Sequence, residues 1–254
     1  MMPYLTNDYA NPSSIYTCGN SIREVIENSR KRIAQILNAK PKEIYFTGSG
    51  TESINWAIKS TAEITGKKHI ITTQIEHHAV LNTCKYLENC GYDITYLPVD
   101  HKGIVSPSSV SDAMRKDTSL ISIMLSNNET GTIQPIKQIS DIAKLYKIPF
   151  HTDAVQAVGH MPVNVNDLGV DLLSLSGHKF NAPKGIGVLY IKSGIQLSPL
   201  LHGGHQERNK RAGTENVASI VGIATALDIA FSEINKESIR QSILLDKLTI
   251  LKQH

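Results

Sequence analysis

The chain has 254 residues, of which 41% are hydrophobic, enough for one substantial core or for a core with a small appendage. Its formal net charge is +3, and the charges are mixed along the chain without the dense Lys/Arg patches of a nucleic-acid-binding protein, so we expect no nucleic-acid partner. No segment reads as a signal peptide or approaches the roughly 20 apolar residues of a membrane span, so we expect no membrane partner. The cysteines Cys18, Cys84 and Cys90 form no CxxC pair, which is typical of a reducing, cytoplasmic setting.

Short β-rich segments alternate with amphipathic helical segments along the chain. In chain order, the predicted elements are a helix over 21–37, a strand over 43–47, a helix over 51–62, a strand over 69–73, a helix over 77–90, a strand over 94–97, a helix over 110–116, a strand over 120–125, a helix over 136–146, strands over 149–152, 171–175 and 187–191, and helices over 216–234 and 236–252. This alternation predicts an α/β fold with a mostly parallel central sheet and helices on both faces. We assign residues 1–235 to one large domain and residues 236–254 to a connecting helix.

Distinctive polar groups follow five of the predicted strands. They are residues 48–51, 76–77, 127–128, Asp153 and 176–179. In mostly parallel sheets, ligands bind at the carboxyl ends of the strands. Because five strand ends meet at one edge of the sheet, we expect these groups to form a single ligand site.

The first group, Gly48-Ser49-Gly50-Thr51, has the composition of an anion-binding turn. Glycines between a strand and a helix let backbone N–H groups approach a phosphate, and the Thr51 hydroxyl is a further donor. The segment is neither a Walker A loop nor a dinucleotide-binding GxGxxG. The alternative is an ordinary helix N-cap with turn glycines.

Two later groups contain ionisable residues suited to a carbonyl cofactor. An ionised Asp153 could keep a pyridinium nitrogen protonated, although it could equally cap the following turn. A lysine after the 171–175 strand could form a Schiff base, with Ser176 and His178 beside it. The residues alone leave Lys179 and Lys184 open for this role, and a solvated surface lysine remains the alternative.

His77 and Asn128 stand at two further strand ends. An imidazole at the His77 position could stack on an aromatic ring or pass protons. The pair His77-His78 with Cys84 lacks the spacing of a metal site, so we expect no metal. Asn128 could bond a phenolic oxygen or be an ordinary turn asparagine.

The motifs SGHK followed by PKGIG, HGGxxER followed by RAGT, EHHAV, SNNETG and HTDAVQ stand in this order along the chain. Together they resemble the class V aminotransferase family, and most closely its NifS/IscS-type cysteine desulfurases, which have the pyridoxal 5′-phosphate (PLP) fold type I. The matching stretches run from Ala10 through the helix after Thr214. The resemblance implies PLP as cofactor, L-cysteine as substrate, L-alanine as product, sulfur transfer to Fe–S cluster or thiolation pathways, a homodimer, and a sulfur-acceptor protein as partner.

The same resemblance implies a role for each site residue. Lys179 is then the Schiff-base lysine, which resolves the choice against Lys184, and His77 is the second catalytic residue, stacking on the ring and handling protons. The residues implied at the phosphate are Gly50, Thr51, Ser176 and His178. The residues implied at the ring are Asp153 on its nitrogen and Asn128 and Gln156 on its phenolic oxygen. Thr214 is implied at the phosphate of the neighbouring subunit, and Asn11 near the substrate carboxylate.

Comparison with the family pattern also implies that the chain is truncated at both ends. Family members carry a strand-like arm before the position of Asn11 and continue past residue 254 into a smaller domain with the persulfide-forming cysteine. Cys84 and Cys90 are expected to be structural thiols. Two alternatives therefore stand beside a cysteine desulfurase: another class V PLP lyase or aminotransferase, and a catalytically inactive PLP-binding scaffold. An α/β protein without PLP, with Lys179 on its surface, is a further alternative.

Overall fold

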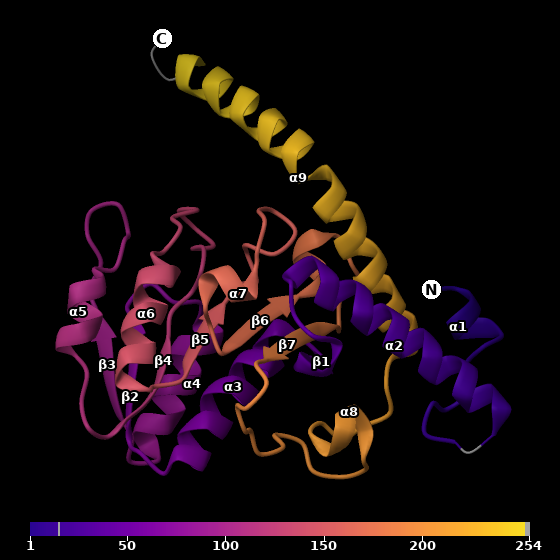
Figure 1. The fold of residues 1–254 in the computed structure, drawn as a ribbon. Helices are drawn as coiled ribbons and strands as arrows, with labels where there is room; N and C mark the ends of the chain where they lie inside the picture. Colours follow the sequence, from indigo (N-terminus) through magenta and orange to yellow (C-terminus); the bar gives the residue numbers. More distant parts are fainter. Residues whose placement is uncertain (15, 252–254) are drawn as a thin grey trace.

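In the computed structural model, which describes residues 1–14 and 16–251, a seven-stranded sheet runs through the centre of the molecule (Figure 1). Its strands are β1 (Ile44–Thr47), β2 (His69–Thr73), β3 (Asp93–Leu97), β4 (Thr118–Ser122), β5 (Phe150–Asp153), β6 (Leu172–Ser176) and β7 (Gly187–Ile191). The spatial order is β1-β7-β6-β5-β4-β2-β3. Strands β2 to β6 pair in parallel, and β7 runs antiparallel to both of its neighbours. The predicted α/β fold with a mostly parallel sheet is confirmed.

Helices cover both faces of this sheet. The longer ones are α2 (Thr17–Leu37), α3 (Gly50–Thr65), α4 (His78–Asn89), α5 (Pro107–Asp112), α6 (Ile136–Tyr146) and α9 (Val217–Leu251). Shorter helical turns are α1 (Pro3–Thr6), α7 (Val165–Leu168), α8 (Gln206–Asn209), η1 (Pro41–Glu43) and η2 (Gly177–Phe180).

Successive strand residues point to opposite faces and so supply two different cores. On β2, Ile70 packs with Ile54 and Ile58 of α3, whereas Ile71 belongs to the core that includes Ile139 of α6. Helices α3 and α4 therefore cover one face, and α2, α6 and α9 cover the other. Burial on both faces of the sheet explains the mostly apolar run at residues 120–125.

Strand β4 is displaced from its predicted position at 120–125, because it begins at Thr118 and ends at Ser122. The reason is that its first two residues are polar yet fully buried, with their hydroxyl groups bonded to His69 of the neighbouring strand at 2.8 Å. A strand prediction based on apolar residues therefore misses the polar residues at the start of β4. Helix α5, predicted at 110–116, instead begins at Pro107, whose fixed φ suits the first helical position.

The last two predicted helices, 216–234 and 236–252, form one continuous helix, α9. The intervening SEINKES segment contains no Gly or Pro to end a helix, so the predicted break is wrong. Residues 252–254 of the predicted connecting segment lie outside the described residues. The boundary at residue 235 between a large domain and a connecting helix stays a prediction.

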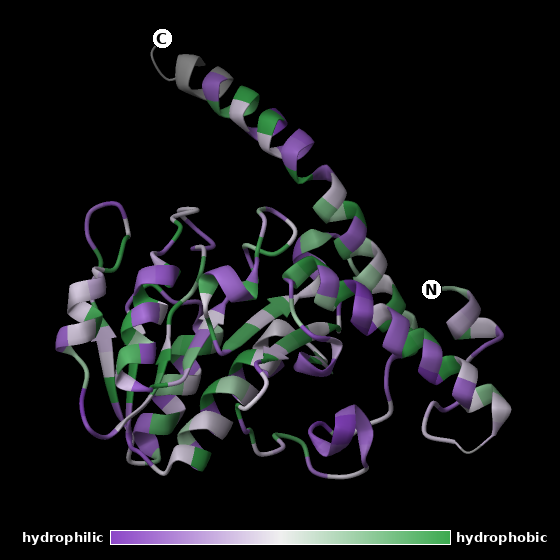
Figure 2. Cartoon of the chain, viewed as in Figure 1, coloured by the Kyte–Doolittle hydropathy of each residue, from purple (hydrophilic) through white to green (hydrophobic). Residues whose placement is uncertain are grey.

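The two halves of α9 lie in different surroundings. The first half packs along α2, with Ile220, Ile223 and Leu227 fully buried. The second half extends away from the sheet with apolar side chains such as Ile239 and Ile243 exposed (Figures 1 and 2). By length and composition alone, Val217–Asp246 could cross a membrane, which the sequence reading missed, but a buried core helix passes the same test.

Candidate active site

One pocket lies at the carboxyl edge of the sheet, where the five predicted strand ends meet. It encloses about 620 Å³ including its open mouth. The predicted residues that line it are Gly50, Thr51, His77, Asn128, Asp153, Gln156, Ser176, His178 and Lys179. Lys184 does not line this pocket, so the geometry favours Lys179 between the two lysines that the residues alone left open.

The turn from β1 into α3 is held by a variant of the capping box, in which the N3 side chain bonds the residue before the N-cap. The Oγ atom of Ser49, the N-cap residue, accepts a hydrogen bond from the Glu52 backbone N–H at 3.1 Å. The Glu52 carboxylate reaches back and accepts from the Gly48 N–H at 2.8 Å. The N–H groups of Gly50 and Thr51 donate to no acceptor among the described residues. These two free donors at the start of a helix form an anion cradle, defined as residues 48–51.

Gly50 has no room for a side chain. A Cβ atom there would stand 2.8 Å from Val155 Cγ2 and 3.0 Å from Ser176 Cβ, closer than van der Waals contact allows. The glycine therefore brings the start of α3 against the residues that follow β5 and β6. The sequence reading gave Gly50 a role through its backbone N–H, and the structure adds this steric reason.

Ser176 and His178 lie on the opposite side of the cradle, in the turn after β6. The Oγ atom of Ser176 is 2.9 Å from Nδ1 of His178, so the two side chains orient each other. Burial, together with the positive charges of Lys179 and Lys184, lowers the pKa of His178. A neutral His178 beside a serine hydroxyl is suited to hydrogen-bond an anion in the pocket.

Asp153 ends β5 with its carboxyl group almost completely buried, at 5% exposure. Burial raises the pKa of Asp153 to about 6, although a hydrogen bond from the Val155 N–H at 2.9 Å and the charge of Lys179 act in the opposite direction. The group is still mostly ionised at neutral pH. A buried carboxylate facing a pocket favours a ligand that carries a positive charge or a proton there.

Lys179 lies in η2, between β6 and β7, and is half-buried. Its backbone carbonyl accepts a hydrogen bond from Nε2 of His160 at 2.9 Å. His160 thus helps to fix the backbone of the lysine. Sequence reasoning missed this contact, because nothing in the local pattern links a histidine 19 positions earlier to the SGHK motif.

His77 is the N-cap residue of α4. Its Nδ1 atom accepts a hydrogen bond from the Ala79 N–H at 3.0 Å, which leaves Nε2 as the nitrogen that carries the proton in the neutral ring. Burial lowers the pKa of His77, and the charges of His78 and Lys179 lower it further. His77 is therefore a neutral imidazole at the pocket wall.

Glu76 lies behind His77 and was not assigned a role from the sequence. Its carboxyl group accepts from the Thr73 hydroxyl at 2.6 Å and from the Met124 N–H at 3.0 and 3.1 Å. Met124 itself lines the pocket. Burial raises the pKa of Glu76 to about 8. Glu76 joins the end of β2 to the segment after β4 and thereby shapes two walls of the site.

Asn128 lines the pocket, and its neighbour Asn127 holds the turn that carries it. The Asn127 Oδ1 atom accepts from the N–H groups of Glu129 and Thr130, both at 2.9 Å. The Asn127 side chain also donates to the Ile75 carbonyl at 2.9 Å. The Asn128 amide donates to the Glu129 carboxylate at 2.7 Å, so its carbonyl oxygen stays free to accept.

Two predicted residues lie outside this pocket. Asn11 is exposed and accepts a hydrogen bond from the Ser13 N–H at 2.8 Å. Thr214 lines a second pocket of about 610 Å³, on the other side of Gly48, together with Arg211 and Glu207. Across the part of the chain that the structure describes, no three His, Cys, Asp or Glu side chains cluster as metal ligands.

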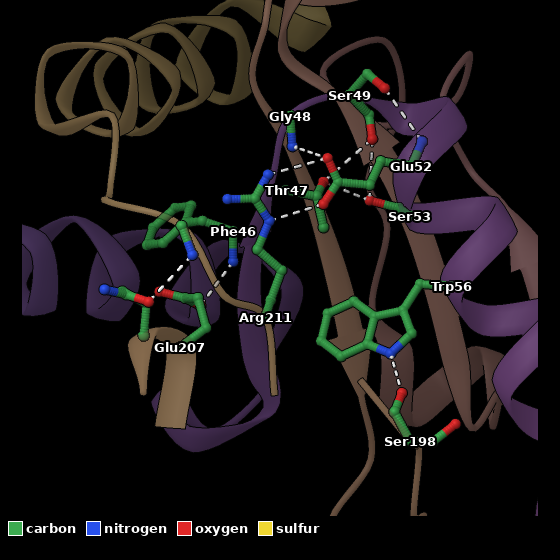
Figure 3. Close-up of polar contacts among 12 residues, drawn as sticks. Phe46, Thr47, Gly48, Ser49, Glu52, Ser53, Trp56, Ser198, Glu207 and Arg211 are labelled. Carbon is green, nitrogen blue, oxygen red and sulfur yellow. Dashed lines mark hydrogen bonds and ion pairs between the residues drawn. The ribbon is translucent and has the colours of Figure 1, made fainter. Parts of the chain in front are cut away.

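The second pocket is bordered by two ion pairs, of which Figure 3 shows the pair between Arg211 and Glu52 beside Gly48. Arg30 and Glu207 form a buried bidentate pair at 2.8 and 2.7 Å, and Glu207 also accepts from the Phe46 N–H at 2.8 Å. Arg211 pairs with Glu52 of the capping box at 2.8 and 3.1 Å. The Gly-rich segment 202–214 is thereby attached to the anion cradle.

These residues fit a phosphorylated pyridine cofactor. The anion cradle offers two free N–H donors in a space that a Cβ atom would fill, and Asp153 offers a buried carboxylate in the same pocket. A mostly parallel sheet with a lysine, an acid and an anion cradle at one edge defines the large domain of a PLP-dependent enzyme of fold type I.

Comparisons with known proteins agree with this class. Residues 1–250 match the family described as Aminotransferase class-V. A solved "NIFS-LIKE PROTEIN" is 42% identical with a TM-score of 0.95, and the match covers 98% of this chain and 69% of that one. A structure described as "SspA in complex with cysteine" is 44% identical with a TM-score of 0.87, over 89% of this chain and 66% of that one. The chain belongs to the class V aminotransferase family, whose cysteine desulfurases depend on PLP.

Two curated relatives show which members of the family this chain is similar to. The "Cysteine desulfurase IscS" of Methanosarcina thermophila is 54% identical over 261 residues, and that of Dictyoglomus turgidum is 56% identical over 248 residues. These matches cover 100% and 97% of this chain. The chain spans 65% and 63% of the length of these two relatives.

Proposed function

We propose that this chain is the PLP-binding part of a cysteine desulfurase, an enzyme that converts L-cysteine into L-alanine and passes the sulfur to an acceptor for Fe–S cluster or thiolation pathways. The observation that carries the proposal is the meeting of Lys179, Asp153 and His77 in one pocket beside the anion cradle. The high identity to relatives named cysteine desulfurase supports this reaction over others of the family.

Each side of the pocket would hold a different part of the cofactor. The N–H groups of Gly50 and Thr51, with Ser176 and His178, would bind the phosphate. Asp153, ionised at neutral pH, would keep the ring nitrogen protonated. When bound, PLP supplies an electron sink for negative charge that develops at the substrate α-carbon.

Two residues would move protons. Lys179 would hold the cofactor through Nζ and, once released by the substrate amine, take and return the α-proton at that atom. His77, whose Nδ1 is engaged by the Ala79 N–H, would exchange a proton only through Nε2. Asn128 and Gln156 would orient the phenolic oxygen, and Asn11 would act near the substrate carboxylate.

Sulfur removal requires a thiolate that attacks the substrate sulfur. Among the described residues, no cysteine lines the pocket: Cys18 and Cys90 are exposed elsewhere, and Cys84 lies on the buried face of α4. Burial raises the pKa of Cys84 to about 12, which keeps it as an inert thiol. The nucleophilic thiolate of the proposed reaction would therefore be supplied from outside the residues that line this pocket.

The placement of Thr214 supports a homodimer as part of the proposal. Thr214 is exposed in the second pocket and does not line the first, which suits a residue that serves a neighbouring subunit's phosphate. Sedimentation at several protein concentrations tests this, and a monomer throughout would overturn it. The cytoplasmic setting stays a prediction.

The first experiment is the visible absorption spectrum after incubation with PLP and desalting. We expect a retained band that is lost in Lys179→Ala and kept in the matched control Lys184→Ala. Alanine release from L-cysteine, with an added thiol as sulfur acceptor, then tests the reaction. A retained band without alanine would replace the desulfurase proposal with a PLP-binding protein that lacks this activity.

A further inference from the structure

The carboxylate of Glu52 lies between two loops that are far apart in sequence (Figure 3). Its Oε2 atom accepts from the Gly48 N–H at 2.8 Å, inside the anion cradle. The same carboxylate accepts hydrogen bonds from Nε of Arg211 at 2.8 Å and from Nη2 at 3.1 Å. Arg211 lies in a loop 159 positions later in the sequence. A single side chain thus touches both the loop that forms the first pocket and the loop that carries Thr214.

Besides the packing of Gly50 against Val155 and Ser176, the cradle has supports within the β1–α3 turn and against β7. Thr47 Oγ1 contacts the Ser49 carbonyl at 3.1 Å and the Ser53 hydroxyl at 2.7 Å. At Gly187, a Cβ atom would stand 2.5 Å from the Ser49 carbonyl carbon, so this glycine allows the turn to lie on β7. Arg211 adds the support of an ion pair, through Glu52, from a loop far along the chain.

The loop of Arg211 is itself firmly attached. Glu207, Arg208 and Asn209 have φ of 45°, 57° and 64°, a left-handed run that is costly for residues with a Cβ. It is held because Glu207 pairs with buried Arg30, and because Arg208 donates to the Ile44 carbonyl at 2.7 Å. Arg211 therefore approaches Glu52 from a fixed base.

The pair also has an electrostatic effect on the cradle. The Glu52 and Arg211 side chains are only 18% and 19% exposed, so solvent screens their charges weakly. Glu52 alone would place a negative charge at the first residue of an anion site. Arg211 cancels that charge while leaving the Gly48 hydrogen bond in place.

We propose that Glu52 and Arg211 are positioning residues whose ion pair keeps the anion cradle ordered and electrically receptive to a phosphate, and so links the cradle to the loop that carries Thr214. Their role is separate from that of Lys179, because neither residue lines the first pocket. The inference rests on the proposed function only in naming PLP as the phosphate that binds.

The test compares ligands with and without a phosphate. Arg211→Met leaves Glu52 uncompensated, so we expect the Kd of PLP and of inorganic phosphate to rise roughly tenfold, a usual size for coupling between neighbouring sites. The Kd of pyridoxal, which has the same ring and aldehyde but no phosphate, should stay within about twofold of the wild type. An equal loss for pyridoxal, or an unchanged Kd for PLP, would overturn the proposal.

A double variant separates charge from fold. Arg211→Met combined with Glu52→Gln removes the repulsion and keeps an acceptor for Gly48, so it should recover most of the lost phosphate affinity; no recovery would count against the proposal. Arg240→Met is the matched control, since it removes one arginine from an exposed pair with Glu237 on α9. If Arg211→Met does not fold, Arg211→Lys keeps the charge without the bidentate contact and should weaken phosphate binding by a smaller factor, with pyridoxal again unchanged.

A failure of the positioning role can be distinguished from a failure of the proposed function. A wild type that binds no PLP would refute the function, while inorganic phosphate would still test the cradle through the same variants. If the wild type binds PLP through Lys179 and the Arg211 variants have the same Kd values as the wild type, the positioning role is refuted and the proposed function stands.

Discussion

Burial raises the pKa of Glu76, and the charge of Asp153 adds to that shift, so the two buried carboxyl groups beside the pocket are electrostatically linked. They differ in environment, because Asp153 ends a strand at the pocket whereas Glu76 is enclosed by Thr73 and Met124. The result is that the acid at the pocket stays mostly ionised at neutral pH and the acid behind it is mostly protonated.

The buried Glu76 makes stability depend on pH. Its pKa of about 8 in the folded protein lies above the ordinary value of 4.5, so folding favours the protonated form. The stabilising contribution is complete below pH 4.5 and is lost as the pH rises towards 8. Glu76→Gln has no proton to lose, so its free energy of unfolding relative to wild type should rise between pH 5 and pH 8 by an amount on the order of a few kcal/mol.

Urea unfolding at the two pH values measures this difference. Glu233→Gln, on the exposed part of α9, serves as control and should show the pH dependence of the wild type. Parallel pH profiles for wild type and Glu76→Gln would show that Glu76 is ionised in the folded protein.

His77 has a structural role that can be separated from its role in the site. Replacing the N-cap by alanine should lower the free energy of unfolding by about 1 kcal/mol, since the Ala79 N–H loses its acceptor. His77→Asn restores a side-chain acceptor and should return most of that stability, while both variants lose the imidazole. Chemical denaturation gives the comparison; equal destabilisation in the two variants would contradict the cap.

Gly50→Ala should damage the fold and the cofactor site together. The added methyl group meets Val155 and Ser176, and such overpacking costs about 1–3 kcal/mol. Gly66→Ala is the control, because Gly66 has a φ of 65° but nothing within 4 Å of the added atom. We expect both variants to lose stability and only Gly50→Ala to lose PLP on desalting; PLP retained by Gly50→Ala would argue against the cradle.

The Arg30–Glu207 pair should contribute far more to the free energy of unfolding than an exposed ion pair on the same helix. Arg30→Met leaves the Glu207 carboxylate buried without its partner, which costs about 3–5 kcal/mol. Arg32→Met breaks the pair with Asp228, where both side chains are well exposed, and should cost less than about 1 kcal/mol. Thermal or urea unfolding of the two variants decides the matter, and similar losses would contradict a tightly packed Arg30–Glu207 pair.

Local patterns were sufficient to predict the sheet, most of its helices and the pocket. Alternating strands and helices fix the order of elements, and a parallel sheet brings polar strand ends such as Asp153 and Lys179 together. Where the buried residues are polar, as at the start of β4, the same patterns misplaced the boundary of the strand.

Contacts between distant segments were beyond the reach of those patterns. The pairs Arg211–Glu52 and Arg30–Glu207 join residues 159 and 177 positions apart, and His160 meets the Lys179 backbone from another loop. Nothing in the periodicity of either segment indicates its partner. Glu76 was visible in the sequence as part of EHHAV, three residues after the end of β2, but no local pattern indicates that its carboxyl group is buried.

The pairing of β1 with β7 has a consequence for how the protein is made. Among the described residues, β1 is the first strand in sequence, yet the strand that pairs with it in the sheet is β7, the last, roughly 140 residues later. At ribosomal speeds of 5–20 residues per second, the backbone groups of β1 wait on the order of ten seconds for their partner to be synthesised. The nascent chain must therefore keep Ile44 and Phe46 from wrong associations until translation has passed β7.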